Sequence, residues 1–277
     1  MDLGASSSSS CAPMLKALAA RKKRPPAAAN GSNNAKRRVK EAGPANSQQH
    51  RHTILGDSSD LVRAVEHLTA VDARFAPIFE AAGPPSALLA KSGSCFDALV
   101  RSIVSQQIST QAAASILTRV RTACKVGPGQ SLSPERVQAV ALQELRDAGL
   151  SAAKASYVSG MAKHFQDGLL NESDIAGLDD DSLNEALQVM KGVGPWTVQM
   201  CSMFHLGRAD VLPVGDLGVR KGMQKFLGLP QLPSAAEMEC LTAAWRPFRS
   251  VGSWAMWRLI APTPTTPAAP ELPSPAS

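Results

Sequence analysis

The chain has 277 residues, of which 44% are hydrophobic and 4% are aromatic, and its formal net charge at pH 7 is +6. This apolar content is sufficient for a sizeable core. No apolar run approaches the roughly 20 residues that a membrane-spanning helix needs, so we expect a soluble protein with no membrane partner. The five cysteines are scattered without a CxxC pair, which indicates reduced thiols in an intracellular protein.

The positive charge is concentrated at the start of the chain. Residues 1–52 contain ten Lys or Arg and two acidic residues, a balance of +8, whereas residues 53–277 contain nineteen and twenty-one, a balance of −2. Any nucleic-acid surface on the folded part must therefore be a local patch. Low apolar content and a serine run predict a disordered basic tail over residues 1–52.

Two basic clusters lie in this tail, RKKR at 21–24 and KRRVK at 36–40. Paired clusters of this kind resemble a bipartite nuclear-import signal, so we expect the protein in the nucleus. A basic arm with nonspecific affinity for DNA and an organellar transit peptide are the alternatives. The opposite end, residues 262–277, is rich in proline and is also expected to be a disordered tail.

The segment 53–261 has helical periodicity throughout and no alternating strand signal, which predicts one all-α domain. Helix-start signals, a serine followed by proline or by glutamate three residues later, recur at Ser133, Ser182 and Ser234. The expected helices span residues 59–69, 95–107, 109–124, 133–147, 151–167, 182–190, 195–206, 217–227, 234–245 and 249–260.

The run KGVGPWTVQM at 191–200 predicts a sharp turn between two helices. Gly192 and Gly194 permit the backbone angles of such a turn, and Pro195 pre-sets the first turn of the second helix. The N–H groups at the start of that helix lack internal partners and favour an anion such as a DNA phosphate. A helix-glycine-helix turn without a ligand is the alternative.

The longer string LQVMKGVGPWTVQ at 187–199 resembles the helix-hairpin-helix DNA-binding motif, here within the unit 182–206. In this motif Lys191 would add a charge and Thr197 a hydroxyl at the phosphate. The DNA-binding residues expected of the hairpin are Lys191, Gly192, Val193, Gly194 and Thr197.

Three further strings accompany the hairpin: FDALVRSIVSQQISTQAAASIL at 96–117, LPVGDLGVRKG at 212–222 and WRPFRSVGSWAMWR at 245–258. In this order they make the chain similar to the helix-hairpin-helix superfamily of DNA glycosylases, and within it to the DNA-3-methyladenine glycosylase II (AlkA-like) family. Larger bacterial members carry an extra β-rich subdomain, for which the stretch before Cys95 leaves no room. The resemblance therefore implies the compact, two-lobed, all-helical form.

The family resemblance implies a monomeric enzyme of base excision repair. Such an enzyme flips an alkylated purine, such as 3-methyladenine or 7-methylguanine, out of double-stranded DNA and hydrolyses its bond to deoxyribose. A glycosylase for another class of lesion is one alternative. A catalytically silent helix-hairpin-helix protein that only binds DNA is the other.

The expected catalytic residue is Asp216, which matches the family's catalytic aspartate. Positive charge develops on the sugar as the base departs, and a carboxylate beside the sugar stabilises it and can activate water. Asp216 also precedes the helix expected at 217, so a capping role is compatible with catalysis. Competing carboxylates are Asp210 and the acids at 179–181, which we expect to cap the following helix.

Trp196 occupies the position at which some relatives carry a lysine that attacks the sugar, so we expect no lyase activity. Only Cys240 follows Asp216, so no iron–sulfur cluster is expected. The resemblance implies at most a monovalent cation, held at the hairpin by the backbone carbonyls of Gln188, Met190 and Val193.

Flipping a base leaves a gap in the stack, and Gln107 matches the position of the family's intercalating wedge. Its neighbour Gln106 would hold the loop; a polar linker between helices is the alternative for both glutamines. Trp196 and Trp257 fall where the family has base-pocket aromatics, which attract a cationic alkylated base. Met200, which stands where some relatives have tyrosine, is the third residue expected in the base pocket. A core role is the alternative for the two tryptophans.

Overall fold

The computed structural model describes residues 53–91, 93–127 and 129–261, so the predictions for the tails at 1–52 and 262–277 lie outside the described residues. Within the described part, all regular elements are helices apart from an isolated antiparallel bridge between Ile54 and Arg208. The expected all-α fold is confirmed. Among the same residues, no helix has both the length and the apolar content needed to cross a membrane.

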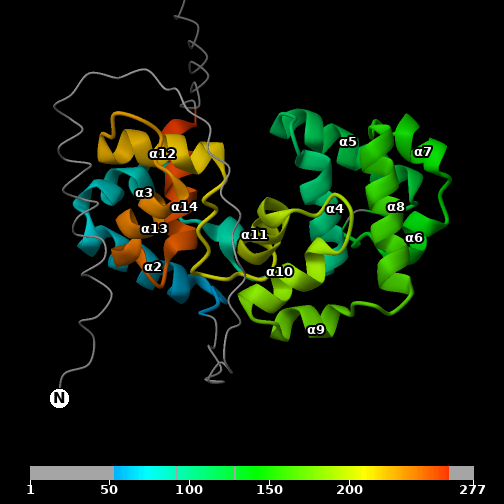
Figure 1. The fold of residues 1–277 in the computed structure, drawn as a ribbon, viewed down its shortest axis with the longest axis horizontal. Coiled ribbons are helices and arrows are strands. Elements are labelled where there is room, and N and C mark those ends of the chain that lie inside the picture. The colour runs from blue at the N-terminus through cyan, green and yellow to red at the C-terminus, as the bar shows by residue number, and fades with distance from the viewer. Residues whose placement is uncertain (1–52, 92, 128, 262–277) are drawn as a thin grey trace, which may run out of the picture.

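The helices form two lobes, which lie side by side in Figure 1. One lobe, called here the contiguous lobe, uses an unbroken stretch of chain from α4 to α10. Its helices are α4 (Cys95–Ser105), α5 (Thr110–Ala123), α6 (Pro134–Gln138), α7 (Leu142–Asp147), α8 (Ala152–Gln166), α9 (Glu172–Gly177) and α10 (Asp180–Gln188).

The other lobe, called here the terminal lobe, combines helices from both ends of the described chain. These are α2 (Ser58–Val71), α3 (Ala76–Ala82), α12 (Leu217–Leu227), α13 (Ala235–Leu241) and α14 (Arg249–Ile260), with the 3-10 turns η1 (Ala73–Phe75), η2 (Ser86–Leu88) and η3 (Ala243–Trp245). Helix α11 (Pro195–Phe204) lies between the two lobes (Figure 1).

Each lobe has its own hydrophobic core, and α11 contributes to both. Val198 and Cys201 pack in the core of the contiguous lobe, whereas Met200 and Met203 pack in the core of the terminal lobe. Because opposite faces of one helix are buried in different cores, α11 fixes the position of the lobes relative to each other.

Close packing of α12 on α14 depends on a glycine. A Cβ atom placed on Gly222 would lie 2.4 Å from the carbonyl oxygen of Met256, so no side chain fits between the two helices there. This contact brings the start of α12, at Asp216, next to Trp257 on α14.

Most expected helices are present, with differences at their ends. The bounds 217–227 and 249–260 match α12 and α14, and Ser133 and Ser234 cap α6 and α13 as expected. Asp179 caps α10, as expected of the acids at 179–181: its carboxylate accepts the N–H of Ser182 at 2.7 Å, and Ser182 itself lies inside the helix. The helix starts earlier because an aspartate is also a strong cap.

Three other differences concern short elements. The helix expected over 133–147 is two helices, α6 and α7, because the backbone becomes extended at Ala141. The segment 234–245 is α13 followed by the 3-10 turn η3. Helices α3 and α9 were not expected; with seven and six residues they are too short for a clear periodic pattern.

Candidate active site

Three N–H donors hold the carboxylate of Asp216. Its Oδ1 accepts from the backbone N–H of Val219 and from Trp257 Nε1, each at 2.8 Å, and its Oδ2 accepts from Trp196 Nε1 at 2.8 Å. The donors belong to α12, α14 and α11, so three helices fix the orientation of one half-buried side chain. Hydrogen bonds to a charged acceptor are the strong ones, and these stabilise the carboxylate's negative charge.

Gly218, which was not predicted as a site residue, is needed for this arrangement. A Cβ atom on Gly218 would lie 2.7 Å and 2.8 Å from the Cδ1 and Nε1 atoms of Trp257 and 3.0 Å from Asp216 Oδ1. A larger residue would push the indole away from the carboxylate. In the string DLG, the glycine therefore makes room for the hydrogen bond that the aspartate accepts.

The two tryptophans expected in a base pocket thus point their N–H groups at Asp216. The ring of Trp257 also stacks on Phe204, with centroids 5.9 Å apart and planes inclined by 27°. Phe204 was not predicted as part of the site. It extends the aromatic surface beside the carboxylate along α11.

A cavity of about 500 Å³ opens between α4 and α11, next to this aromatic surface. Ala98 and Ser102 line it from α4, and Met200 and Phe204 line it from α11. Met200 is only 8% exposed, because it also packs in the core of the terminal lobe. Asp216 does not line the cavity; the link between the two is the stack of Phe204 on Trp257.

The hairpin turn is shaped by its first glycine and left open at its second. Gly192 has φ +87°, and a Cβ atom there would lie 2.4 Å from the ring of Tyr157. Gly194 begins α11 without a side-chain cap, and a Cβ atom there would meet no described heavy atom within 4 Å. No side chain therefore caps the first N–H groups of α11, as an anion site at this helix start requires.

The other residues expected to bind DNA at the hairpin are placed differently. Lys191 is exposed beside the turn, whereas the Val193 side chain is 5% exposed and packs in the core of the contiguous lobe. Thr197 is 1% exposed, and its hydroxyl accepts Gln106 Nε2 at 3.1 Å. This hydroxyl lies inside the protein and not on the open side of the turn.

The loop after α4 is tied to the hairpin. The side-chain amide of Gln106 donates to the carbonyl oxygen of Gly192 at 3.0 Å and to Thr197. Gln107, the expected wedge, is exposed and has φ +60°, a left-handed conformation that is uncommon outside glycine. The helix expected to reach residue 107 therefore ends at Ser105.

The carbonyls expected to hold a cation belong to Gln188, at the end of α10, and to Met190 and Val193 in the turn. The carbonyl oxygen of Met190 accepts the N–H of Val193 at 3.1 Å, so the chain curls back on itself here. A carbonyl oxygen has a second lone pair, which is compatible with a cation ligand.

Three of the competing carboxylates, Asp179, Asp180 and Asp210, have structural partners. Asp210 accepts hydrogen bonds from Arg249 Nε at 2.7 Å and from Arg246 Nη1 at 2.7 Å. Asp180 pairs with Arg208, whose side chain is almost fully buried. These contacts leave Asp216 as the acid that is surrounded by aromatic rings.

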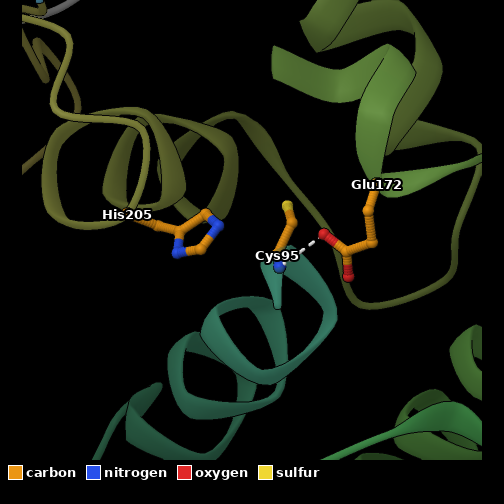
Figure 2. A group of neighbouring side chains, drawn as sticks. All are labelled: Cys95, Glu172 and His205. Atoms are coloured by element: carbon orange, nitrogen blue, oxygen red, sulfur yellow. Dashed lines mark hydrogen bonds between the residues drawn. The ribbon is translucent and has the colours of Figure 1, made fainter. Parts of the chain in front are cut away.

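A second cluster of chemically active side chains does not include Asp216. Cys95, Glu172 and His205 place one potential metal-ligand atom each within 4.8 Å of one another (Figure 2). The carboxylate of Glu172 is occupied, however: it accepts hydrogen bonds from Ser94 Oγ at 2.7 Å, Cys95 N at 2.7 Å and Phe96 N at 3.1 Å. Glu172 therefore caps α4.

The thiol in this cluster is also unsuited to a metal ion. Its Sγ lies 3.2 Å from that of Cys201, and this contact together with burial raises the pKa of Cys95 above its ordinary value. Metals bind the thiolate, and here the thiol form is favoured. Burial lowers the pKa of His205, and a neutral imidazole can be a metal ligand, so Cys95 and Glu172 are the residues that disfavour a metal ion. The cluster has a structural explanation.

Known proteins with similar sequences belong to a family of DNA repair proteins. Residues 100–247 match the HhH-GPD superfamily of base excision DNA repair proteins. The chain is 27% identical over 206 residues to the alkylbase DNA glycosidase-like protein mag2 of Schizosaccharomyces pombe, covering 74% of this chain and 96% of that protein.

Two solved structures are similar to this fold. The 3-methyladenine DNA glycosylase Mag1 of the same yeast, in complex with abasic DNA, gives a TM-score of 0.63 at 28% identity, covering 71% of this chain and 95% of that one. A DNA-3-methyladenine glycosidase from Bacillus halodurans gives a TM-score of 0.58 at 31% identity, covering 75% and 91%.

Proposed function

Because the chain belongs to the HhH-GPD superfamily of base excision DNA repair proteins, we propose that it is a monofunctional glycosylase that excises alkylated purines from double-stranded DNA. The observation that carries this proposal is the carboxylate of Asp216, held by one backbone amide and two indole N–H groups. The names of the relatives support 3-methyladenine as the first substrate to test. We propose 7-methylguanine, another alkylated purine, as the second.

The chemistry assigned to Asp216 is electrostatic. As the bond between purine and deoxyribose lengthens, positive charge develops on the sugar, and a fixed carboxylate stabilises that charge without having to reorient. The same group can orient the attacking water. Trp196 and Trp257 hold the carboxylate through their ring edges and offer aromatic surface, which attracts the positive charge of an alkylated base.

The approach to DNA uses the hairpin and the loop after α4. The open start of α11 and the charge of Lys191 would take a phosphate. The exposed side chain of Gln107 would fill the gap that the flipped nucleotide leaves. Binding in this way presents the damaged strand to Asp216.

The expected product is an abasic site in an uncut strand. Trp196 has no amine that could form a Schiff base with the sugar, and its indole N–H is used by Asp216. Treatment of a reaction mixture with borohydride is expected to trap no covalent protein–DNA adduct. A trapped adduct would contradict the monofunctional reaction.

The proposal is tested by incubating the full chain with methylated DNA and quantifying free bases by chromatography. We expect release of 3-methyladenine. Release only from oxidised or deaminated DNA would reassign the lesion class. DNA binding without release of any base would identify a silent binding protein.

We further propose that the protein acts in the nucleus, on the basis of the two basic clusters in residues 1–52, and as a monomer, as the family resemblance implies. A fusion of this segment to a fluorescent protein tests the nuclear localisation, which accumulation in an organelle would contradict. A sedimentation experiment on the full chain tests the monomer.

No cofactor other than a monovalent cation is proposed. The carbonyl oxygens of Gln188, Met190 and Val193 would hold it, and its charge would favour a phosphate at the turn. DNA affinity that does not change between potassium and a bulky organic cation at equal ionic strength would contradict this site.

A further inference from the structure

Lys154 lies at a position where its own helix disfavours a positive charge. It lies in the first turn of α8, and the positive end of the helix dipole opposes a cation there. Burial lowers the pKa of its ammonium group from the ordinary value, and among the described residues no carboxylate forms an ion pair with it. The groups that stabilise the Lys154 ammonium must therefore belong to another element.

That element is the end of α4. Lys154 Nζ donates to the carbonyl oxygens of Val104 and Gln106, each at 2.7 Å. The last carbonyls of a helix have no partner within the helix and carry the negative end of its dipole, so a cation is favourable here. Lys154 caps α4 across a sequence separation of 50 residues to Val104.

The capped carbonyl of Gln106 belongs to the peptide group that joins it to Gln107. Gln107 has φ +60°, and a left-handed conformation of a residue other than glycine persists only where its surroundings impose it. Gln106 is held at both ends, because its side chain donates to Gly192 and Thr197 while its carbonyl accepts from Lys154. Both contacts fix the backbone immediately before the exposed side chain.

We propose that Lys154 is a positioning residue that holds Gln107 in its wedge conformation before DNA binds. The loop and the hairpin then meet the duplex as one preformed surface, and no backbone ordering is needed while the base is flipped. This inference rests on the proposed function, since the wedge acts only in flipping a base.

The test compares Lys154→Met with Lys163→Met, which changes an exposed lysine of the same helix, paired with Asp167. Single-turnover base release is measured on a lesion in paired duplex and on the same lesion in a single strand, where no wedge is needed. Lys154→Met removes both bonds, of which the one to Gln106 bears on Gln107; it is expected to lose about tenfold on the duplex, the effect of that one charge-assisted bond, and to be unchanged on the single strand. Lys163→Met is expected to change neither.

A second variant separates positioning from general damage. Gln107→Ala combined with Lys154→Met is expected to lose no more than Gln107→Ala alone, since both act through one side chain. Equal losses on duplex and single strand, or additive losses in the double variant, would overturn the proposal. If Lys154→Met does not fold, Lys154→Gln, which keeps an amide donor, is measured in the same way.

A measurement that does not depend on base release distinguishes this inference from the proposed function. Fluorescence of 2-aminopurine placed opposite an abasic-site analogue reports insertion of the wedge. Lys154→Met is expected to reduce that signal, and an unchanged signal contradicts the positioning role. Absence of base release by the wild-type protein, with the signal intact, would refute only the glycosylase activity.

Discussion

Asp216 and Glu172 are two carboxylates at helix starts, and each accepts three hydrogen bonds. The donors of Glu172 are consecutive residues at the start of α4. Those of Asp216 come from three helices, and two of them are indole side chains. The difference is thus in the origin of the donors and not in their number.

The comparison indicates how a functional carboxylate can be told from a capping one. A cap needs only the free N–H groups of one helix. Asp216 satisfies one such group and turns its remaining acceptor sites to neighbouring aromatic residues. Side chains from other helices restrict its orientation beyond what capping needs, which is expected where orientation affects a rate.

The largest expected effect is that of Asp216→Asn. Asparagine caps a helix about as well as aspartate, so the protein is expected to fold, but the charge that stabilises the developing cation is lost. Base release from methylated DNA should fall by at least about a thousandfold in single-turnover measurements. Binding to lesion DNA, measured by fluorescence anisotropy, should be retained. Undiminished excision would falsify the catalytic role.

Trp257→Phe removes one donor to Asp216 and keeps the aromatic ring. We expect a loss of about tenfold in the single-turnover rate, since one hydrogen bond to a charged group is removed. Trp254→Phe on the same helix is the control: this ring stacks on Phe79 and makes no hydrogen bond to Asp216, so stability should fall without a matching loss of rate. A rate unaffected by Trp257→Phe would show that the indole bond is dispensable.

Gly218→Ala tests the hydrogen bond between Trp257 and Asp216 by displacing the indole and leaving its N–H group in place. The new Cβ atom would lie 2.8 Å from Trp257 Nε1, so the indole must move. We expect a loss of rate no larger than that of Trp257→Phe, and no further loss when the two changes are combined. Gly160→Ala in α8 is the control, because its Cβ atom would meet no described atom within 4 Å. Additive losses would mean that Gly218 acts elsewhere.

The smallest effect on activity is expected for Glu172→Gln. It removes the charge that caps α4 and should lower the free energy of unfolding by about 1 kcal/mol, measured by urea denaturation. Excision per folded molecule should not change. Glu185→Gln, at an exposed position of α10, is the control for loss of charge alone. A reduced rate in Glu172→Gln would link the cap to the active site after all.

Local signals allowed much of the site to be predicted from the sequence. Gly192, Gly194 and Pro195 mark a turn by backbone chemistry, and α12 and α14 were predicted with their observed bounds. The buried residues of α12 follow a helical period, whereas α14 is buried on all sides over residues 249–256. The family resemblance drew attention to Asp216 and to the two tryptophans. The structure brings these three residues into direct contact, while their roles in binding and catalysis remain predictions.

Long-range contacts could not be predicted in this way. The bond between Trp257 and Asp216 spans 41 residues, and the contact of Lys154 with Val104 spans 50. A lysine in the first turn of a helix gives no local indication that it caps another helix. Thr197 was expected to face DNA, but the partner that turns its hydroxyl inward, Gln106, lies 91 residues earlier.

The division of the terminal lobe between the two ends of the described chain has a consequence during protein synthesis. Chains emerge from the ribosome with the N-terminal part first, so α2 and α3 must wait for α12–α14 before they can bury their apolar faces. The contiguous lobe has no such delay. Trp257, on the last helix, completes the contacts of Asp216 only when nearly all of the chain has been made. A nascent chain that already displays the hairpin therefore still lacks one of the groups that orient its carboxylate.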